Sequence, residues 1–432
     1  MNLKIIIHRG TKQIGGSCVE VSCGGDRILL DLGLPLPQPG EASTRIDKVS
    51  VLELLHDGVL PTIAGVYRDS VPDVKAVILS HVHQDHTGLA GFVHPDIPVL
   101  ATAGTWALTD SIVPFAPTQQ VITNRRTLDK NKPMRLGCIS VTAIPVDHSA
   151  PDAAALYIEG GGRRLLYTGD LRSHGKKGYL FDQMISRFHG KVDTLLIEGT
   201  TVGSPGHACK SESSLEADFL DVFRKQSGLT LIFCSGQNLD RIVVIFRSAK
   251  IAGKTMVIDL YTAFVLHKLG ALSKRIPQFD WPEIRIIAWP YQEQALRKAG
   301  EGEFVAQTRE RWTSTRAMKD QGSEHILLMR ANRMMNSLES HLGTAARQSH
   351  VIWSMWDGYW NDDKYVRPFC ERHGISPIRI HTSGHASWTD LQRLIVGINP
   401  TAIVPIHTIH AKVFDEHFEN VRLPDDGETF LV

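Results

Sequence analysis

The sequence predicts an α/β fold that carries its chemistry on the loops following its strands. Short apolar runs typical of buried strands, such as "VKAVILS" (74–80), alternate along the 432 residues with segments typical of helices. Histidines and aspartates follow several of these runs directly, most densely in "HVHQDH" (81–86). Because loops at strand ends carry the functional residues of α/β proteins, the pattern indicates both the fold class and the place of a site.

The first two hundred residues predict mainly short strands joined by glycine-rich turns. Helices are expected to begin at "TGLAGFV" (87–93) and after the strand in "PVLATAGTWALTD" (98–110). Further strands are expected in "LKIIIHRG" (3–10), "GSCVEVSCGGDRILLDLG" (16–33), "ISVTAIPVDHS" (139–149), "AALYIEGGGRRLLYTGD" (154–170) and "VDTLLIEGTT" (192–201).

The pattern changes near residue 205, where a second unit of alternating strands and helices begins. "HVIWSMWDGYW" (350–360) is interpreted as the last strand and turn of this unit. From residue 376 onward, "SPIRIHTSGHASWTDLQRLIV" (376–396) and "PTAIVPIHTIHAKVF" (400–414) predict strand, histidine-bearing loop, helix and strand again.

Composition excludes several classes of protein. The formal net charge is +1 and 42% of the residues are hydrophobic, which is an ordinary globular balance without the excess charge of a non-specific nucleic-acid coat. Six cysteines without a CxxC pair favour reduced thiols over a disulfide framework. No stretch approaches the roughly 18 apolar residues of a membrane span, and the N-terminal apolar run is too short for a signal peptide. We therefore expect a cytoplasmic protein without a membrane partner.

The "HVHQDH" segment has the residue types and spacing of a metal site. Imidazole nitrogens and carboxylate oxygens suit Zn²⁺, with Mn²⁺ possible where oxygen ligands predominate. Four groups in one loop cannot close two sites, so further ligands must come from other strand ends. The candidates are Asp31 in "LLDLG", His148 in "VDHS", Asp170 in "YTGD" and His407 in "VPIHT".

The order "LLDLG", "SHVHQDHTG", "VDHS", "YTGD" resembles the metallo-β-lactamase fold, an αββα sandwich with its metals at one edge of the sheets. The resemblance implies two divalent metal ions, with Asp170 bridging them and Asp31 orienting the histidine loop as a non-ligand. It assigns His81, His83 and His148 to one metal, and Asp85, His86 and His407 to the other.

Three further residues resemble motifs of the β-CASP nucleases within that fold: Glu198 in "LLIEGTT", His385 in "SGHAS" and His407. The likeness is greatest to the catalytic core of ribonuclease J, without its additional C-terminal domain. It implies a metallo-β-lactamase domain of residues 1–204 and 376–432, interrupted by an inserted β-CASP α/β domain of residues 205–375. The chain departs from the family at "WSMWDGYW" (353–360), where a loop of another sequence is expected.

The resemblance implies hydrolysis of phosphodiester bonds by water activated between two metals. Asp85 is expected to take a proton from that water, and His385, steered by Glu198, to protonate the leaving 3′ oxygen. The expected substrate is single-stranded nucleic acid, RNA ahead of DNA, with exonuclease and endonuclease action both open. Phosphate contacts are expected from Ser383, Gly384, Ala386 and Ser387.

Other interpretations stay open beside this one. The chain could be a small-molecule hydrolase of the same fold, such as a phosphodiesterase or lactonase, or a non-catalytic β-CASP scaffold subunit. A homodimer is possible. The tryptophans at 353, 356 and 360 favour core or interface packing over base stacking. Basic residues that could line a groove for the phosphate backbone, or simply be solvated, are Arg241, Arg247, Lys250 and Lys254.

Overall fold

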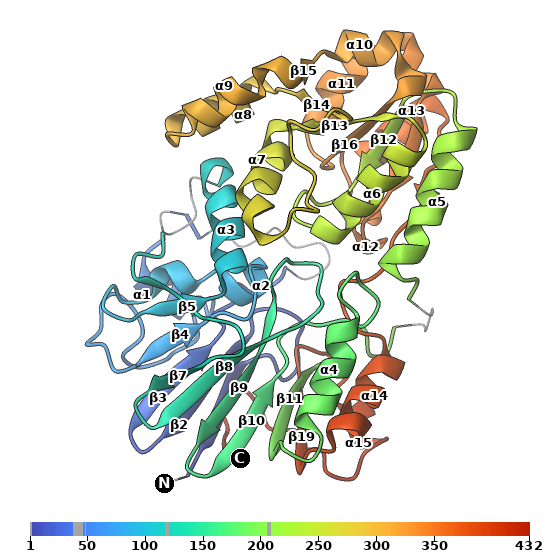
Figure 1. The fold of residues 1–432 in the computed structure, drawn as a ribbon. Coiled ribbons are helices and arrows are strands. Elements are labelled where there is room, and N and C mark those ends of the chain that lie inside the picture. Colours follow the sequence, from blue (N-terminus) through green and yellow to red (C-terminus); the bar gives the residue numbers. More distant parts are fainter. Residues whose placement is uncertain (1, 38–45, 48, 117–120, 205–208) are drawn as a thin grey trace.

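The computed structural model describes residues 2–37, 46–47, 49–116, 121–204 and 209–432. Two sheets form the lower half of the molecule in Figure 1, and a third sheet with its own helices forms the upper half. Among the described residues, no helix combines the length and apolarity that crossing a bilayer requires. All six cysteines are free, as expected from their spacing.

The first sheet has seven strands in the order β20-β1-β2-β3-β4-β5-β6. β20, β1, β2 and β3 pair antiparallel, whereas β3 to β6 pair parallel. The strands are β1 (Lys4–Arg9), β2 (Cys18–Cys23), β3 (Asp26–Leu30), β4 (Ala76–Ile78), β5 (Val99–Ala101), β6 (Arg125–Thr127) and β20 (Thr429–Leu431).

The second sheet has six strands in the order β19-β11-β10-β9-β8-β7. β7 to β10 pair antiparallel, and β10, β11 and β19 pair parallel. The strands are β7 (Pro133–Leu136), β8 (Ile139–Pro145), β9 (Ala154–Gly160), β10 (Arg163–Tyr167), β11 (Thr194–Glu198) and β19 (Ala402–Ile406).

The two sheets pack face to face because their side chains alternate between two environments. In β3, Ile28 and Leu30 enter the core between the sheets, while Leu29 packs on the outer helices. Leu196 of β11 likewise points inward, between two neighbours that point outward. The outer helices are α1 (Val51–His56) and α3 (Ala103–Ile112) on the first sheet, and α4 (Tyr179–Phe188), α14 (Trp388–Ile398) and α15 (Lys412–Asp415) on the second. These four layers are the expected αββα sandwich.

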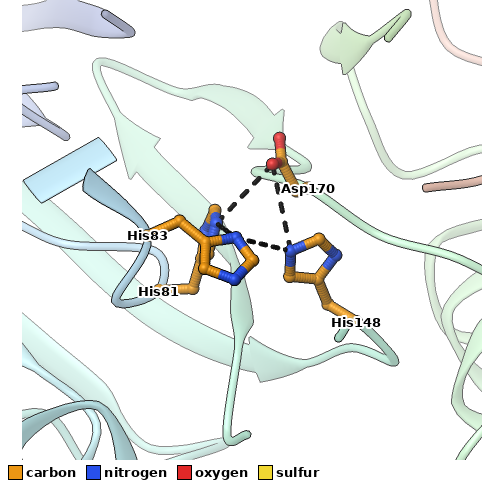
Figure 2. Close-up of side chains that lie close together, drawn as sticks. All are labelled: His81, His83, His148 and Asp170. Carbon is orange, nitrogen blue, oxygen red and sulfur yellow. Dashed lines mark hydrogen bonds and ion pairs between the residues drawn. The ribbon is translucent and has the colours of Figure 1, made fainter. Parts of the chain in front are cut away.

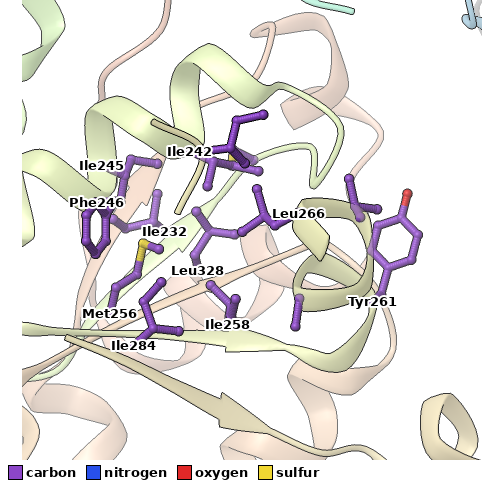
Figure 3. Packing of buried hydrophobic residues seen from close by; sticks show 14 of the residues in the cluster. Ile232, Ile242, Ile245, Phe246, Met256, Ile258, Tyr261, Leu266, Ile284 and Leu328 are labelled. Atoms are coloured by element: carbon purple, nitrogen blue, oxygen red, sulfur yellow. The ribbon is translucent and has the colours of Figure 1, made fainter. Parts of the chain in front are cut away.

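The third sheet is entirely parallel, in the order β15-β14-β13-β16-β12-β17-β18. Its central strands are buried on both faces, as a parallel sheet requires, while the two edge strands are partly exposed; Figure 3 shows one of the two cores. The strands are β12 (Thr230–Phe233), β13 (Thr255–Asp259), β14 (Ile284–Ile287), β15 (Trp312–Thr313), β16 (His325–Met329), β17 (His350–Trp353) and β18 (Ile378–Arg379).

Helices cover both faces of the third sheet. The core drawn in Figure 3 packs under α5 (Glu212–Lys225), α6 (Leu239–Ile251), α7 (Leu260–Leu269), α8 (Pro290–Lys298) and α9 (Gly302–Thr308). The opposite core packs under α10 (Thr315–Asp320), α11 (Met334–Leu342) and α13 (Val366–His373). The single turn α12 (Gly358–Asn361) follows β17.

The two halves meet through apolar side chains. Helix α3 packs against α7, and Leu108 of α3 is buried in the same cluster as Phe264 of α7. The rings of Phe115 and Tyr261 meet edge to face with centroids 5.0 Å apart. The two-sheet sandwich and the third-sheet unit therefore share a continuous core rather than a hydrated joint.

The domain limits at residues 204 and 375 stay a prediction. The first limit meets residues 205–208, which lie outside the described residues. The third sheet runs from Thr230 to Arg379, so its last strand follows residue 375. We call the part of the chain from α5 to β18 the insert.

The prediction of a helix that begins at residues 87–93 is wrong about the length of the helix. The structure has only the single turn α2 (Gln84–Thr87) and a 3₁₀ turn at Ala90–Phe92. Gly88 and Gly91 interrupt the segment, and glycine has a low helix propensity. A Cβ at Gly88 would also lie 2.7 Å from Leu34 Cβ. The short turns therefore follow from glycine content and close packing.

Candidate metal centre

Asp31 fixes the histidine loop from the end of β3. It has a φ of +58°, which is rare for a residue with a side chain, and is completely buried. The carboxylate accepts hydrogen bonds from Ser80 N at 2.7 Å, Ser80 Oγ at 2.8 Å, His86 Nδ1 at 2.7 Å and the Tyr167 hydroxyl at 2.6 Å. With its oxygens so used, Asp31 orients the loop, and it is in none of the candidate ligand groups.

Three histidines and an aspartate converge from separate strand ends into one group (Figure 2). His83 Nδ1 lies 3.2 Å from His81 Nε2 and 3.1 Å from His148 Nε2. Asp170 Oδ2 lies 3.5 Å from His81 Nε2 and 4.0 Å from His148 Nε2. Four potential ligand atoms thus surround one point.

Burial keeps these three imidazoles neutral. Desolvation lowers the pKa of His81, His83 and His148 below 6.5, and repulsion between the neighbouring rings lowers it further. A neutral imidazole offers a lone pair, which is the form that a metal ion binds.

A second group shares Asp170 and comprises Asp85, His86 and His407. His86 Nε2 lies 3.3 Å from Asp170 Oδ2, and His407 Nε2 lies 3.2 Å from Asp85 Oδ2. His407 adopts a φ of +54° directly after β19, and its amide donates to the Gly10 carbonyl at 2.7 Å. This turn brings His407 back from the end of the second sheet to the loop of the first.

The donor set fits a pair of divalent cations. Both oxygens of Asp170 and the Nε2 atom of His86 are buried and have no hydrogen-bond partner among the residues that the structure describes. A buried carboxylate without donors is costly unless a cation satisfies it. Nitrogen-rich ligands on one side and mixed nitrogen and oxygen ligands on the other suit Zn²⁺ or Mn²⁺.

Next to these groups, Glu198 and His385 form a pair. His385 Nδ1 donates to the Glu198 carboxylate at 3.1 Å, and Glu198, at the end of β11, also accepts from Leu171 N at 2.9 Å and Thr200 N at 3.2 Å. Burial disfavours a charge on His385, but Glu198 and then Asp170 outweigh it and raise its pKa to about 9. The Nδ1 atom of His385 is thus engaged by Glu198.

The four residues expected to contact phosphate have different environments. The amide of Ala386 donates to the Leu171 carbonyl at 2.6 Å, and the Ser387 hydroxyl caps α14 through Asp390. Ser383 Oγ accepts from the His385 amide at 3.0 Å. A Cβ at Gly384 would lie 2.8 Å from Ser149 Oγ, so glycine permits a close approach there. Phosphate binding by this loop stays a prediction.

The tryptophans of 353–360 divide between core and surface. Trp353 is buried in the third-sheet unit, while Trp356 is 63% exposed. The Arg379 guanidinium stacks over Trp360, 4.2 Å from the ring centroid. Core packing therefore holds for Trp353 and fails for Trp356, whose packing at an interface stays a prediction.

Sequence reasoning missed a group of buried charges behind the His385 loop. Arg172, Glu212 and Arg241 have no exposed side-chain surface, although Arg241 was a candidate for an exposed groove. That interpretation of Arg241 is wrong. The only sequence signal was the place of Arg172, two residues after Asp170; the burial of a charge is not visible in a sequence.

We compared the chain with known protein families. Residues 51–215 match the family model described as the beta-lactamase superfamily domain. This part of the chain is thus similar to a β-lactamase superfamily domain. The expected metallo-β-lactamase sandwich with an inserted α/β unit is thereby confirmed, because the superfamily domain, the αββα layers and the separate third sheet occur together.

Several curated proteins are similar to nearly the whole length of the chain. A protein named ribonuclease J from Mycobacterium tuberculosis is 24% identical over 429 residues, covering 94% of this chain and 68% of the relative. Another ribonuclease J, from Methanocaldococcus jannaschii, is 24% identical and covers 94% and 91%. A crystal structure of a protein of unknown function from Enterococcus faecalis superposes with a TM-score of 0.81 over 100% of both chains at 22% identity, which shows the fold.

Proposed function

We propose that this protein is a metal-dependent ribonuclease that hydrolyses phosphodiester bonds of single-stranded RNA. The supporting observation is the meeting of two ligand groups at Asp170 beside the His385–Glu198 pair. The similarity to proteins named ribonuclease J over 94% of the chain supports RNA as the substrate. Homodimerisation and a cytoplasmic location stay predictions.

Two divalent cations, Zn²⁺ or Mn²⁺, would be held by this chain. When bound, such a pair activates water and neutralises charge on the phosphate. His81, His83 and His148 would bind one cation, Asp85, His86 and His407 the other, with Asp170 between them.

The chain's own side chains would move the protons. Burial favours a neutral Asp85, but His407 and His86 lower its pKa, so Asp85 is a carboxylate that can accept a proton from water. The water oxygen bonds to phosphorus and the bond from phosphorus to O3′ breaks. His385 gives its Nε2 proton to the departing O3′, so the products are a 5′-phosphate and a 3′-hydroxyl.

The test is cleavage of 5′-labelled single-stranded RNA and DNA of one sequence, with Zn²⁺, Mn²⁺ or a chelator. We expect metal-dependent cleavage of RNA, reduced by about 10²–10⁴-fold in His385→Ala, which is the usual contribution of general acid catalysis. Asp85→Ala should lose cleavage at least as fully. His410→Ala, which changes an exposed histidine outside the ligand groups, is the matched control and should keep full activity.

Intact RNA in the presence of protein carrying two metals would refute the proposal. Hydrolysis of small phosphodiesters or lactones by that protein would then support a small-molecule hydrolase, and inactivity on all of them a scaffold subunit. Preference for DNA over RNA would correct the substrate.

A further inference from the structure

The loop that carries His385, Ile380–Ala386, is held by its carbonyl oxygens. At one end, Ser354 Oγ donates to the Ile380 carbonyl at 2.6 Å. At the other end, Thr201 Oγ1 donates to the Ala386 carbonyl at 2.6 Å. Side chains from the insert and from the sandwich thus hold opposite ends of the loop.

The middle of the loop is held by two histidines of the sandwich. His174 Nε2 lies 2.9 Å from the Ser383 carbonyl oxygen, and His148 Nδ1 donates to the Gly384 carbonyl at 2.7 Å. The second contact fixes the ring of a candidate metal ligand through the loop that carries His385. A displacement of this loop would therefore move both His385 and the ring of His148.

Arg241 of α6 reaches the loop from within the insert. Its guanidinium donates to Ser354 Oγ at 2.5 Å, to the Ile380 carbonyl at 3.4 Å and to the Thr382 carbonyl at 3.4 Å. The same group makes a two-pronged contact with Glu212 of α5, at 3.0 Å to each carboxylate oxygen. A lysine could not reproduce this planar fork.

Arg172 reaches the loop from the sandwich and meets the same glutamate. It donates to the Ser383 carbonyl at 3.2 Å, to Glu212 at 3.2 Å and to Asp240 at 2.8 Å. Its Nε also lies 3.4 Å from Asp147, the residue before His148. Burial opposes a charge on Glu212, but Arg241 and Arg172 outweigh it and lower the pKa of Glu212.

We infer that Arg172, Glu212 and Arg241 form a positioning network that sets His385 at the reacting phosphate, so that the insert orients the general acid of the sandwich. The inference rests on the proposed function of His385. These charges are completely buried, and burying an ion pair is seldom favourable to stability by itself. The many contacts of this network to one loop are instead suited to fixing the position of that loop. A misplacement of a catalytic group by about 1 Å can lower the reaction rate by about 10²-fold.

The decisive substrate is RNA in which sulfur replaces the bridging 3′ oxygen of one scissile bond. A thiolate leaves without a proton, so its departure does not need His385. We expect Arg241→Lys to lower kcat for ordinary RNA by about 10–100-fold, with KM nearly unchanged, and to cleave the sulfur-substituted bond at close to the wild-type rate. Glu212→Gln should behave in the same way, which covers the case that Arg241→Lys does not fold.

The control is Arg297→Lys, the same exchange at an exposed position on α8 of the insert, where arginine pairs with Glu293 rather than with the loop. It should leave both rates unchanged. Metal content, measured by mass spectrometry, should equal that of the wild type in every variant. Adding Arg241→Lys to His385→Ala should cause no further loss on ordinary RNA, because the acid it positions is already absent.

Three results would overturn the inference: full activity of Arg241→Lys and Glu212→Gln on RNA, equal losses on both substrates, or losses that add to that of His385→Ala. An inactive wild type would instead refute the proposed function, so the two failures are distinguishable.

Discussion

At the scale of single residues, the site depends on side chains held by unusual backbone. Asp31 and His407 both have positive φ although neither is glycine, and both lie directly after a strand that ends at the metal centre. Such conformations persist when surrounding contacts determine them, and they cluster at functional sites. Two of the five non-glycine residues with positive φ in the described part of the chain thus lie where side chains must face the ligand groups.

We expect Asp31→Asn to weaken metal binding by about 10–100-fold, as is typical when a residue supporting a metal ligand is changed. Asparagine tolerates the positive φ, so the backbone should keep its path. The asparagine side chain would lack the negative charge that holds His86. It would also place an N–H group where the Tyr167 hydroxyl or the His86 ring now donates. Competition with a chelator measures the affinity. Asn399→Asp, a reverse exchange at a positive φ on the C-terminus of α14, should leave the affinity unchanged.

At the scale of elements, β2 carries a buried carboxylate whose pairing should make stability depend on pH. Glu20 meets His8 Nε2 at 3.0 Å and Arg27 Nε at 2.8 Å. Burial alone would raise the pKa of Glu20, but these partners lower it from 4.5 to about 2. A lowered pKa stabilises the folded protein above the unfolded value and ceases to do so as pH falls through the folded value.

Glu20→Gln should therefore destabilise the protein by on the order of 3 kcal/mol at pH 7. The difference from the wild type should shrink as pH falls from 4.5 toward 2. Urea unfolding at a series of pH values measures it. Asp73→Asn, which removes the 74% exposed second partner of Arg27, is the control and should cost less than about 1 kcal/mol at any of these pH values. A loss that does not vary with pH would contradict the assignment.

The helices and strands differ in how well the sequence predicts them. Short apolar runs between glycine-rich turns predicted the strands of the sandwich, because most of these strands are covered on both faces. Extent was harder: α2 is one turn, although the apolar residues after it favoured a longer helix. Gly88 and Gly91 could have indicated the interruption, but the close packing of Gly88 beside Leu34, where a Cβ would lie 2.7 Å away, is not visible in a local pattern.

At the scale of the whole molecule, the metal centre joins strand ends from both sheets of the sandwich. Its ligand candidates could be found from the sequence because each group follows a strand in a short local motif. Arg172, Glu212 and Arg241 could not be found in that way. Arg172 and Glu212 are 40 residues apart along the chain, and Glu212 and Arg241 are 29 apart. They lie in two units and come into contact only when the insert packs on the sandwich.

Removing metal should lower the stability of the whole protein. A ligand that binds only the folded state stabilises it by about 2.7 kcal/mol at one hundred times its Kd. We therefore expect a chelator to lower Tm by several degrees and added Zn²⁺ or Mn²⁺ to restore it. Asp170→Asn, which changes the residue common to both ligand groups, should have a Tm that hardly responds to either. Scanning calorimetry measures the shift, and an unchanged Tm of the wild type would count against the centre.

The two attachment points of the insert lie side by side, because Thr382 Oγ1, just after β18, donates to the Lys210 carbonyl, just before α5, at 2.6 Å. Adjacent attachment points make a module exchangeable, since another compact unit can be grafted there without stretching the host. A graft in this protein would inherit the metal ligands, which all belong to the host, but not Glu212 or Arg241. Such a chimera should bind its cations and release poor leaving groups slowly, so exchanging modules would separate metal loading from the orientation of the acid.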